Sequence, residues 1–157
     1  MKFIDCSAAI GYGGINRQIV NHEKYIVKEK VNEPKNAEEL LAEVDFNGID
    51  RAVVYHSAMV DVSPSYGNAE IAAECAKEPE RLIPSLAVLP SIYNPEFTVE
   101  KIDEKMRECG AYSLRAYPAE NRFMLDAVTC GDLLDYLIAR SIPLYLSPAF
   151  GWEYIFA

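Results

Sequence analysis

Six side chains in this sequence have the chemistry of a catalytic or binding site. Carboxylates and imidazoles act as general acids or bases, whereas guanidinium and hydroxyl groups bind anions through hydrogen bonds. All six lie within or just after short apolar stretches that are typical of strands. The set comprises two candidate catalytic residues, Asp5 and His56, and four candidate substrate-binding residues, Arg115, Ser7, Ser147 and Tyr117.

Arg115 is the most informative of these residues, because it lies near the end of the apolar segment 111–116. A guanidinium at the mouth of a site can hold a carboxylate in a bidentate pair, which would suit an anionic organic acid as substrate. The alternative is a structural ion pair with Asp5 or Glu120. The residue types leave both roles open.

His56 follows Tyr55 at the end of a β-branched segment and is the best general acid or base in the sequence. The alternative is a hydrogen-bonded structural histidine. A hydrolytic triad of Ser147, His56 and Asp5 is disfavoured, because no Gly-x-Ser-x-Gly turn surrounds the serine. The second histidine, His22, falls in an irregular and charged region.

Motifs for cysteine metal sites or nucleotide binding are missing from the sequence. Its four cysteines, of which Cys6 is the first, are far apart and include no Cys-x-x-Cys pair, so we expect reduced, buried thiols. Segment 11–16, Gly-Tyr-Gly-Gly-Ile-Asn, lacks the third glycine of a dinucleotide-binding loop. The residues therefore predict neither a metal ligand set nor a cofactor.

The charge balance excludes several classes of partner. With 24 acidic residues against 15 Lys and Arg, the formal net charge is -9, the wrong sign for binding nucleic acid or an anionic membrane surface. No apolar run approaches the roughly 20 residues that span a bilayer. We expect a cytoplasmic protein whose partner is a small molecule.

The strands that would position these residues recur along the chain. Segments 50–55 and 82–88 are apolar almost throughout, as in strands buried on both faces of a sheet. From the second strand on, strand centres are separated by about 30 residues, the length of a βαβ unit, which predicts a parallel sheet. The predicted strands cover 3–6, 50–55, 82–88, 111–116 and 142–146.

Helices are expected between these strands. Asn36 and Glu39 form a capping box for a helix that stops at Gly48. A second helix starts at Asn68, and a third ends at Gly110, a residue suited to a left-handed cap. For the last helix, the capping box is assigned to Thr129 and Asp132.

The order of these signals resembles the amidohydrolase superfamily, in particular its amidohydrolase-related branch of aminocarboxymuconate-semialdehyde-decarboxylase-like enzymes. The similarity extends over nearly the whole chain, although each piece is short. The matching segments are 3–6 (Phe-Ile-Asp-Cys) with Ile10 and Gly11, 48–54, Asn68, 79–84 with Pro90, 109–114 and 141–144.

This resemblance implies a metal-dependent (β/α)8 barrel of TIM type. Zinc is an example of the divalent metal that the family uses. Its first strand delivers a His-x-His pair of ligands, which falls here on Ser7 and Ala9, and a further ligand histidine falls on Ser147. Hydroxyl groups are poor ligands for zinc or iron, and alanine offers none. The resemblance thus implies a member with a degenerate metal site.

Such a barrel needs about 250 residues, whereas this sequence contains signals for about five strands. We therefore expect one domain, residues 1–157, that forms the N-terminal part of a barrel. Exposed strand edges would need covering, either by a missing C-terminal half or in a homo-oligomer. A truncated family member is the favoured interpretation.

Three functions follow from these expectations. The first is a hydrolase or decarboxylase that acts on a small organic acid. The second is a catalytically inactive binding or assembly subunit on the same scaffold. The third is a flavodoxin-like doubly wound protein, which five parallel strands also fit, although the phosphate loop is lacking.

Overall fold

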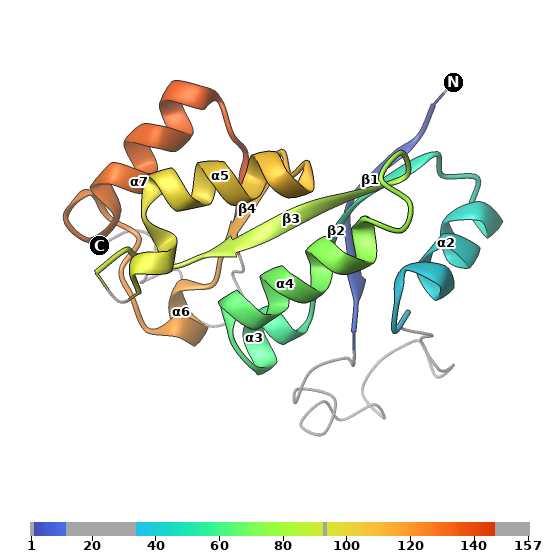
Figure 1. The fold of residues 1–157 in the computed structure, drawn as a ribbon, viewed down its shortest axis with the longest axis horizontal. Helices are drawn as coiled ribbons and strands as arrows, with labels where there is room; N and C mark the ends of the chain where they lie inside the picture. Colours follow the sequence, from blue (N-terminus) through green and yellow to red (C-terminus); the bar gives the residue numbers. More distant parts are fainter. Residues whose placement is uncertain (1, 12–33, 93, 147–157) are drawn as a thin grey trace, which may run out of the picture.

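The structure, a computed structural model, describes residues 2–11, 34–92 and 94–146. This part of the chain holds five strands in one parallel sheet, with helices between them (Figure 1). The strands are β1 (Ile4–Ile10), β2 (Arg51–His56), β3 (Leu82–Val88), β4 (Ser113–Ala116) and β5 (Leu144–Leu146). The helices are α2 (Ala37–Phe46), α3 (Ala58–Asp61), α4 (Pro64–Cys75), the 3-10 turn η2 (Pro95–Phe97), α5 (Val99–Cys109), α6 (Pro118–Asn121) and α7 (Ala127–Arg140).

The strand order separates the two parallel folds that the sequence left open. The sheet runs β1-β2-β3-β4-β5, in the order of the chain. A doubly wound sheet reverses direction at a switch point and places its first strand inside the sheet, whereas a barrel adds each strand beside the previous one. The prediction of an incomplete TIM-type barrel is confirmed, and the flavodoxin-like alternative is wrong.

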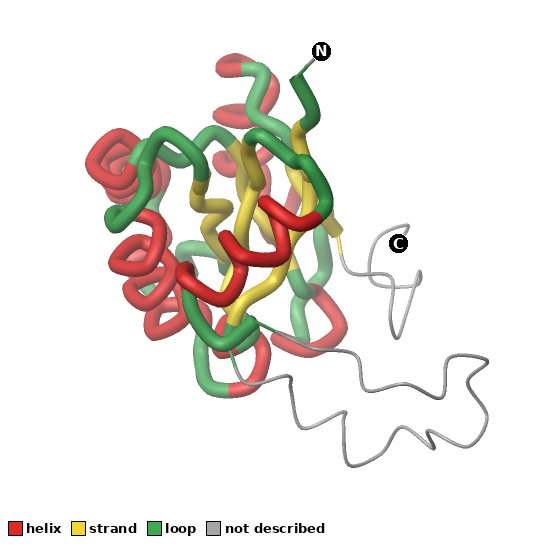
Figure 2. Tube along the Cα trace, turned by 90° about the vertical axis from the view of Figure 1, so that its right-hand side faces the viewer, coloured by secondary structure: helices red, strands yellow, loops and turns green. Residues whose placement is uncertain are grey.

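The sheet is also curled as a barrel requires. In a flat sheet β1 and β4 would lie about 14 Å apart, at about 4.8 Å per strand step. The guanidinium of Arg115 on β4 nevertheless donates to Ser7 Oγ on β1 over 3.0 Å. This bond crosses the concave side of the sheet and brings two non-adjacent strands together. Figure 2 shows the strands side by side, with helices flanking them.

Two of the predicted helix ends agree with the structure. Asn36 Oδ1 accepts from the backbone N–H of Glu39 over 2.9 Å and caps α2. The Glu39 carboxylate accepts from the backbone N–H of Lys35. Helix α5 ends at Gly110, whose φ of 72° lies in the left-handed region that glycine adopts without strain.

Three predicted boundaries were wrong. Strand β1 continues past Cys6 to Ile10, because Ala8 and the two residues after it pair with β2. Helix α4 begins at Pro64 with Ser63 as its cap, so Asn68 lies inside the helix. Helix α7 is capped by Asp126, whose side chain accepts from Val128 and Thr129. Ser63 and Asp126 are the N-caps of these helices, and they lie a few positions before Asn68 and Thr129, where the sequence had placed the helix starts.

The two faces of the sheet differ in chemistry. Alternate residues such as Val54, Leu86 and Leu114 are buried and join the hydrophobic core with α4 and the other helices. The residues between them face the concave side. That side carries polar side chains on β3 and β4: Ser113 Oγ donates to Ser85 Oγ over 2.9 Å, and both serines are buried. The concave side is therefore the better place for a candidate site.

Pairing between β2 and β3 stops at Val54 and Pro84, before the site is reached. Beyond this point the side chain of Asn68 forms hydrogen bonds with the backbone of β3. Its Nδ2 donates to the Ala87 carbonyl over 2.8 Å, and its Oδ1 accepts from the Ala87 N–H over 2.7 Å. Helix α4 thereby satisfies the backbone of the residue that lies opposite Arg115 in the pairing of β3 with β4.

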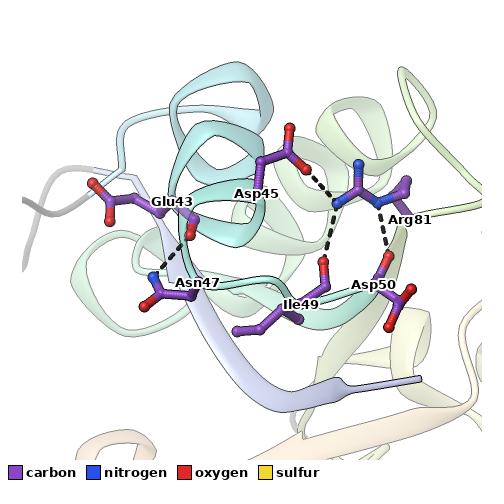
Figure 3. Close-up of polar contacts among 6 residues, drawn as sticks. All are labelled: Glu43, Asp45, Asn47, Ile49, Asp50 and Arg81. Carbon is purple, nitrogen blue, oxygen red and sulfur yellow. Dashed lines mark hydrogen bonds and ion pairs between the residues drawn. The ribbon is translucent and has the colours of Figure 1, made fainter. Parts of the chain in front are cut away.

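Arg81 ties together the opposite end of the sheet, where α2 leads into β2 (Figure 3). Its Nε donates to the Asp50 carbonyl over 2.7 Å, and one terminal nitrogen reaches the Ile49 carbonyl and the Asp45 carboxylate. Nearby, Asn47 Nδ2 donates to the Glu43 carbonyl at the end of α2. These contacts hold the turn in place and belong to the fold.

Replacing two helical glycines with alanine should change the free energy of unfolding in opposite directions. A Cβ on Gly67 would clash with the Met59 backbone nitrogen, whereas a Cβ on Gly131 would meet nothing within 4 Å. We expect Gly67→Ala to lower the free energy of unfolding by about 1–3 kcal/mol through overpacking. Gly131→Ala should raise it by about 0.5–1 kcal/mol. Urea unfolding of both variants tests this, and equal shifts of the same sign would contradict it.

Candidate functional site

Arg115 is held on the concave side of the sheet by aromatic rings. Only 7% of the residue is exposed. Its guanidinium carbon lies 4.0 Å from the centroid of the Tyr55 ring and 4.5 Å from that of Tyr145. Tyr145 is its pairing partner on β5, and Tyr55 comes from β2. Such stacking favours a guanidinium and fixes its plane.

Ser7 on β1 contacts this guanidinium, and Asp5 contacts Ser7. Ser7 Oγ accepts from Arg115 Nη2 over 3.0 Å, and the Asp5 carboxylate accepts from the backbone N–H of Ser7 over 2.9 Å. The two residues fall at the shift in register between β1 and β2, which lies between Asp5 and Ala8. A bulge of this kind changes the direction of side chains and is frequent near functional sites.

Tyr117 directly follows β4 and precedes α6. It is 6% exposed, and its hydroxyl makes no well-aligned hydrogen bond to the described residues, although the Arg115 guanidinium is near enough to act on it as a hydrogen-bond donor. Burial raises the pKa of Tyr117 to about 12, although the nearby Arg115 guanidinium opposes the shift. The hydroxyl therefore stays protonated at neutral pH and keeps a proton that it can donate.

These side chains enclose a small pocket. It has a volume of about 160 Å³ and is lined by Tyr55, Arg115, Tyr117, Tyr145 and Leu146. Within the described part of the chain, Arg115 Nε and the Tyr117 hydroxyl are both buried without a well-aligned hydrogen-bond partner. The ion pairs found among the described residues involve Lys77, Arg81, Arg107 and Arg140, and Arg115 is in none of them.

His56 is not brought into this pocket. It follows Tyr55 within β2, and successive side chains of a strand point to opposite faces. Since Tyr55 contacts Arg115, His56 faces the helices. Its Nδ1 accepts from the backbone N–H of Ala58 over 3.1 Å, and its charge acts on Glu74 of α4.

The remaining candidates are placed as follows. Ser147 and His22 lie outside the described residues. Cys6 is exposed on β1, whereas Cys75 and Cys130 are buried, as expected for inert thiols. Burial raises the pKa of the Cys75 thiol to about 12. None of the helices described in the structure has the length and apolar character to span a bilayer.

Sequence reasoning missed Tyr55 and Tyr145, the two rings that hold the guanidinium. Both occupy strand positions that face the concave side, one residue away from side chains of the core. The alternation of inward and outward side chains along β2 and β5 could have shown that both rings share a face with Arg115. The sequence did not reveal this alternation, because both strands carry apolar residues on each face.

A second, larger cavity lies away from these residues. It has a volume of about 890 Å³ and lies between the starts of α5 and α7. Glu100, Asp132 and Asp135 are among the residues that line it. It contains none of the six predicted site residues, and its carboxylates make it unsuited to an anionic ligand.

Several solved structures share this fold. A 5-carboxyvanillate decarboxylase from Novosphingobium aromaticivorans, complexed with manganese and a nitrobenzoic acid, has a TM-score of 0.67 at 20% identity, over 94% of this chain and 50% of its own. A dihydroxybenzoic acid decarboxylase from Polaromonas, with bound manganese and 2-nitroresorcinol, has a TM-score of 0.69 at 15% identity, over 98% and 51%. A probable 2-pyrone-4,6-dicarboxylic acid hydrolase from Acinetobacter baumannii, with citric acid bound, has a TM-score of 0.56 at 15% identity, over 93% and 49%.

These comparisons concern the fold. No protein-family model and no curated protein matches the sequence. The chain spans about half the length of the solved structures that it resembles. By name those structures are decarboxylases and a probable hydrolase, and at 15–20% identity the similarity to them is one of fold, which agrees with the fold that the sequence resemblance implied. The chain therefore has the fold of about half of the barrel found in these enzymes.

Proposed function

We propose that this chain is a degenerate member of the amidohydrolase superfamily that binds a small organic carboxylate at the strand ends of its part-barrel. Hydrolysis or decarboxylation is the expected class of reaction. The fold supports this proposal, and so do the names of the similar structures, which are decarboxylases and hydrolases of small acids.

The observation that carries the proposal is the environment of Arg115. A permanently charged guanidinium that is 7% exposed is costly to bury unless an anion or hydrogen-bond acceptors compensate for the lost water. Ser7 supplies one acceptor, and Nε has none among the described residues. A ligand carboxylate would supply the missing acceptor together with the missing negative charge.

The pocket beside Arg115 suits a ligand with a planar ring. A cavity of about 150 Å³ accepts a benzene molecule, and this pocket measures about 160 Å³. Its walls are tyrosine rings, which stack on flat ligands. Arg115 and Tyr117 line the pocket, and their side chains carry the hydrogen-bond donors proposed to bind a carboxylate.

Asp5 and His56 remain the proposed acid–base residues, with different support. Asp5 is linked to the pocket through the backbone of Ser7. His56 faces the helices, so a catalytic role would require its ring to leave that face. The proposal therefore relies on Asp5 before His56.

A catalytically inactive binding subunit is the second candidate. One observation favours it: the described lining of the pocket contains no histidine, aspartate or glutamate. The two candidates differ in turnover. Incubating the full chain with 2,6-dihydroxybenzoate and following carbon dioxide release tests for decarboxylation, and release would exclude the inactive subunit.

Calorimetric titration of the full chain with benzoate and benzamide tests the proposed function. The two probes have similar size, but only benzoate carries a charge. Benzoate should bind at least about 10-fold more tightly, because one charged hydrogen bond contributes about 1.5–3 kcal/mol. Equal affinity for the two probes, or binding of neither, would refute the proposal.

Replacing Tyr117 with phenylalanine should weaken benzoate binding about 5–10-fold, the value of one hydrogen bond. The exposed Tyr112 offers the matched control, and Tyr112→Phe should leave the dissociation constant unchanged. Since the pKa of Tyr117 is about 12, binding to the unmodified chain should persist through pH 10. It should fall when the pH approaches 12, where deprotonation removes the donor and repels the ligand. A loss of binding at the ordinary tyrosine pKa of about 10 that occurs in the unmodified chain and not in Tyr117→Phe would contradict this.

The other expectations from the sequence remain predictions. Within the described residues β1 and β5 each pair on one side only, so we still expect a missing C-terminal half or a homo-oligomer to cover these edges. One domain over residues 1–157 and a cytoplasmic location likewise stay predictions. Light scattering of the purified chain would measure its oligomeric state.

A further inference from the structure

The positive charge of the strand-end pocket comes from the protein itself. Similar structures carry bound manganese. The superfamily resemblance places two ligand positions at Ser7 and Ala9, so the suitability of these residues for a divalent ion can be examined. A serine hydroxyl is a weak ligand for such ions, and an alanine side chain offers no ligand atom.

The guanidinium adds a stronger objection to a metal at this place. Ser7 Oγ already accepts from Arg115 Nη2 over 3.0 Å. An ion coordinated by that oxygen would lie next to a second positive charge, and like charges at this distance repel. Among residues 2–11, 34–92 and 94–146, no three side chains of His, Cys, Asp or Glu gather in a way that could hold a metal. The described residues do not fit a divalent ion.

We infer that the pocket binds its carboxylate directly on Arg115 and Tyr117, and that the guanidinium takes the place that the superfamily resemblance assigns to a metal ion. This inference rests on the proposed function and goes beyond it by specifying how the anion is held. It assigns Ser7 to orient the guanidinium and not to coordinate an ion.

Two independent features show that the pocket is built for an anion. Arg115 and Tyr117 are each more than nine-tenths buried, and each retains a donor without a partner among the described residues. Rings from β2 and β5 stack on the guanidinium at 4.0 and 4.5 Å, which keeps its donor atoms in one plane. A planar carboxylate matches a planar guanidinium, whereas a metal needs ligands distributed around it.

The first test measures the metal dependence of binding. The full chain is treated with EDTA and titrated with benzoate, before and after addition of Mn²⁺. The dissociation constant should stay the same within about twofold, a difference below one hydrogen bond. Elemental analysis after desalting should find manganese well below one ion per chain. Benzoate binding that requires Mn²⁺ would overturn the inference.

The second test is the substitution Ser7→Asp, for which carboxylate binding by Arg115 and metal binding by Ser7 predict opposite results. In Ser7→Asp a carboxylate would lie beside the Arg115 guanidinium and compete with the ligand, so benzoate binding should fall about 10-fold or more. If Ser7 instead coordinated an ion, the same change would supply a better ligand, and Mn²⁺ uptake and Mn²⁺-dependent binding would rise. Ser7→Ala is the matched control and should change the dissociation constant by no more than about fivefold.

The outcomes separate this inference from the proposed function. Binding that is independent of Mn²⁺ and is lost in Ser7→Asp supports both. Binding that appears only with Mn²⁺ overturns the inference and leaves carboxylate binding intact. Binding of benzoate under neither condition overturns the proposed function, and the inference with it.

Discussion

Arg115→Met should abolish benzoate binding at millimolar ligand, with a dissociation constant at least about 100-fold higher than that of the unmodified chain. Charged hydrogen bonds contribute about 1.5–3 kcal/mol each, and every 1.4 kcal/mol corresponds to a factor of ten. Methionine retains an unbranched apolar stem between the two tyrosine rings, so the pocket keeps most of its shape. Isothermal titration calorimetry at neutral pH measures the change.

The same substitution should leave stability nearly unchanged. Burial of a guanidinium without an ion pair is costly, and its removal offsets the loss of two ring contacts and the bond to Ser7. We expect the free energy of unfolding to change by no more than about 1 kcal/mol.

Arg81→Met provides the matched control for this arginine. Arg81 donates to two backbone carbonyls and to Asp45 at the far end of the sheet (Figure 3). Its loss should lower the free energy of unfolding by about 1–3 kcal/mol and leave benzoate binding unchanged. Should Arg115→Met still bind benzoate normally, the pocket would not be a carboxylate site.

Asn68→Ala should be the most destabilising single change proposed for the fold. The Asn68 amide is the partner of both the N–H and the carbonyl of Ala87, and the asparagine is only 6% exposed. Its removal leaves two buried backbone groups unpaired, at about 1–3 kcal/mol each, so we expect a loss of about 2–5 kcal/mol. Urea unfolding followed by circular dichroism measures it.

Asn47→Ala is the control for this second variant. Asn47 also bonds a backbone carbonyl through its side chain, but it is exposed to solvent. Water replaces the lost bond there, and the expected change is within about 0.5 kcal/mol. Similar destabilisation by the two substitutions would show that Asn68 does not bridge α4 and β3 as described.

Much of the fold could be predicted because its signals are local. The continuous apolar segments of β2 and β3, the Asn36 cap and the left-handed Gly110 each depend on a few neighbouring residues. The starts of α4 and α7 were wrongly predicted because more than one nearby residue could act as the N-cap. Ser63 with Pro64, and Asp126 with its two backbone donors, start their helices before the residues that the spacing favoured.

The candidate site was predictable in part. Parallel strands end at one edge of a sheet, so Ser7, Arg115 and Tyr117 were expected near one another, and the structure brings them together. His56 was predicted to lie near them because it is also at the end of a strand. Its position one residue after Tyr55 points it to the other face, and only the register of β2 with its neighbours reveals which face that is.

The sequence by itself determined the alternation of strands and helices, the acidic balance and the residue types at the strand ends, because each of these is a property of composition or short-range periodicity. The tertiary structure alone decided that Ser7 meets Arg115 across three strand steps and that Tyr55 and Tyr145 enclose the guanidinium. The physical reason is the curl of the sheet. It brings residues 108 positions apart within hydrogen-bonding distance, which no local pattern encodes.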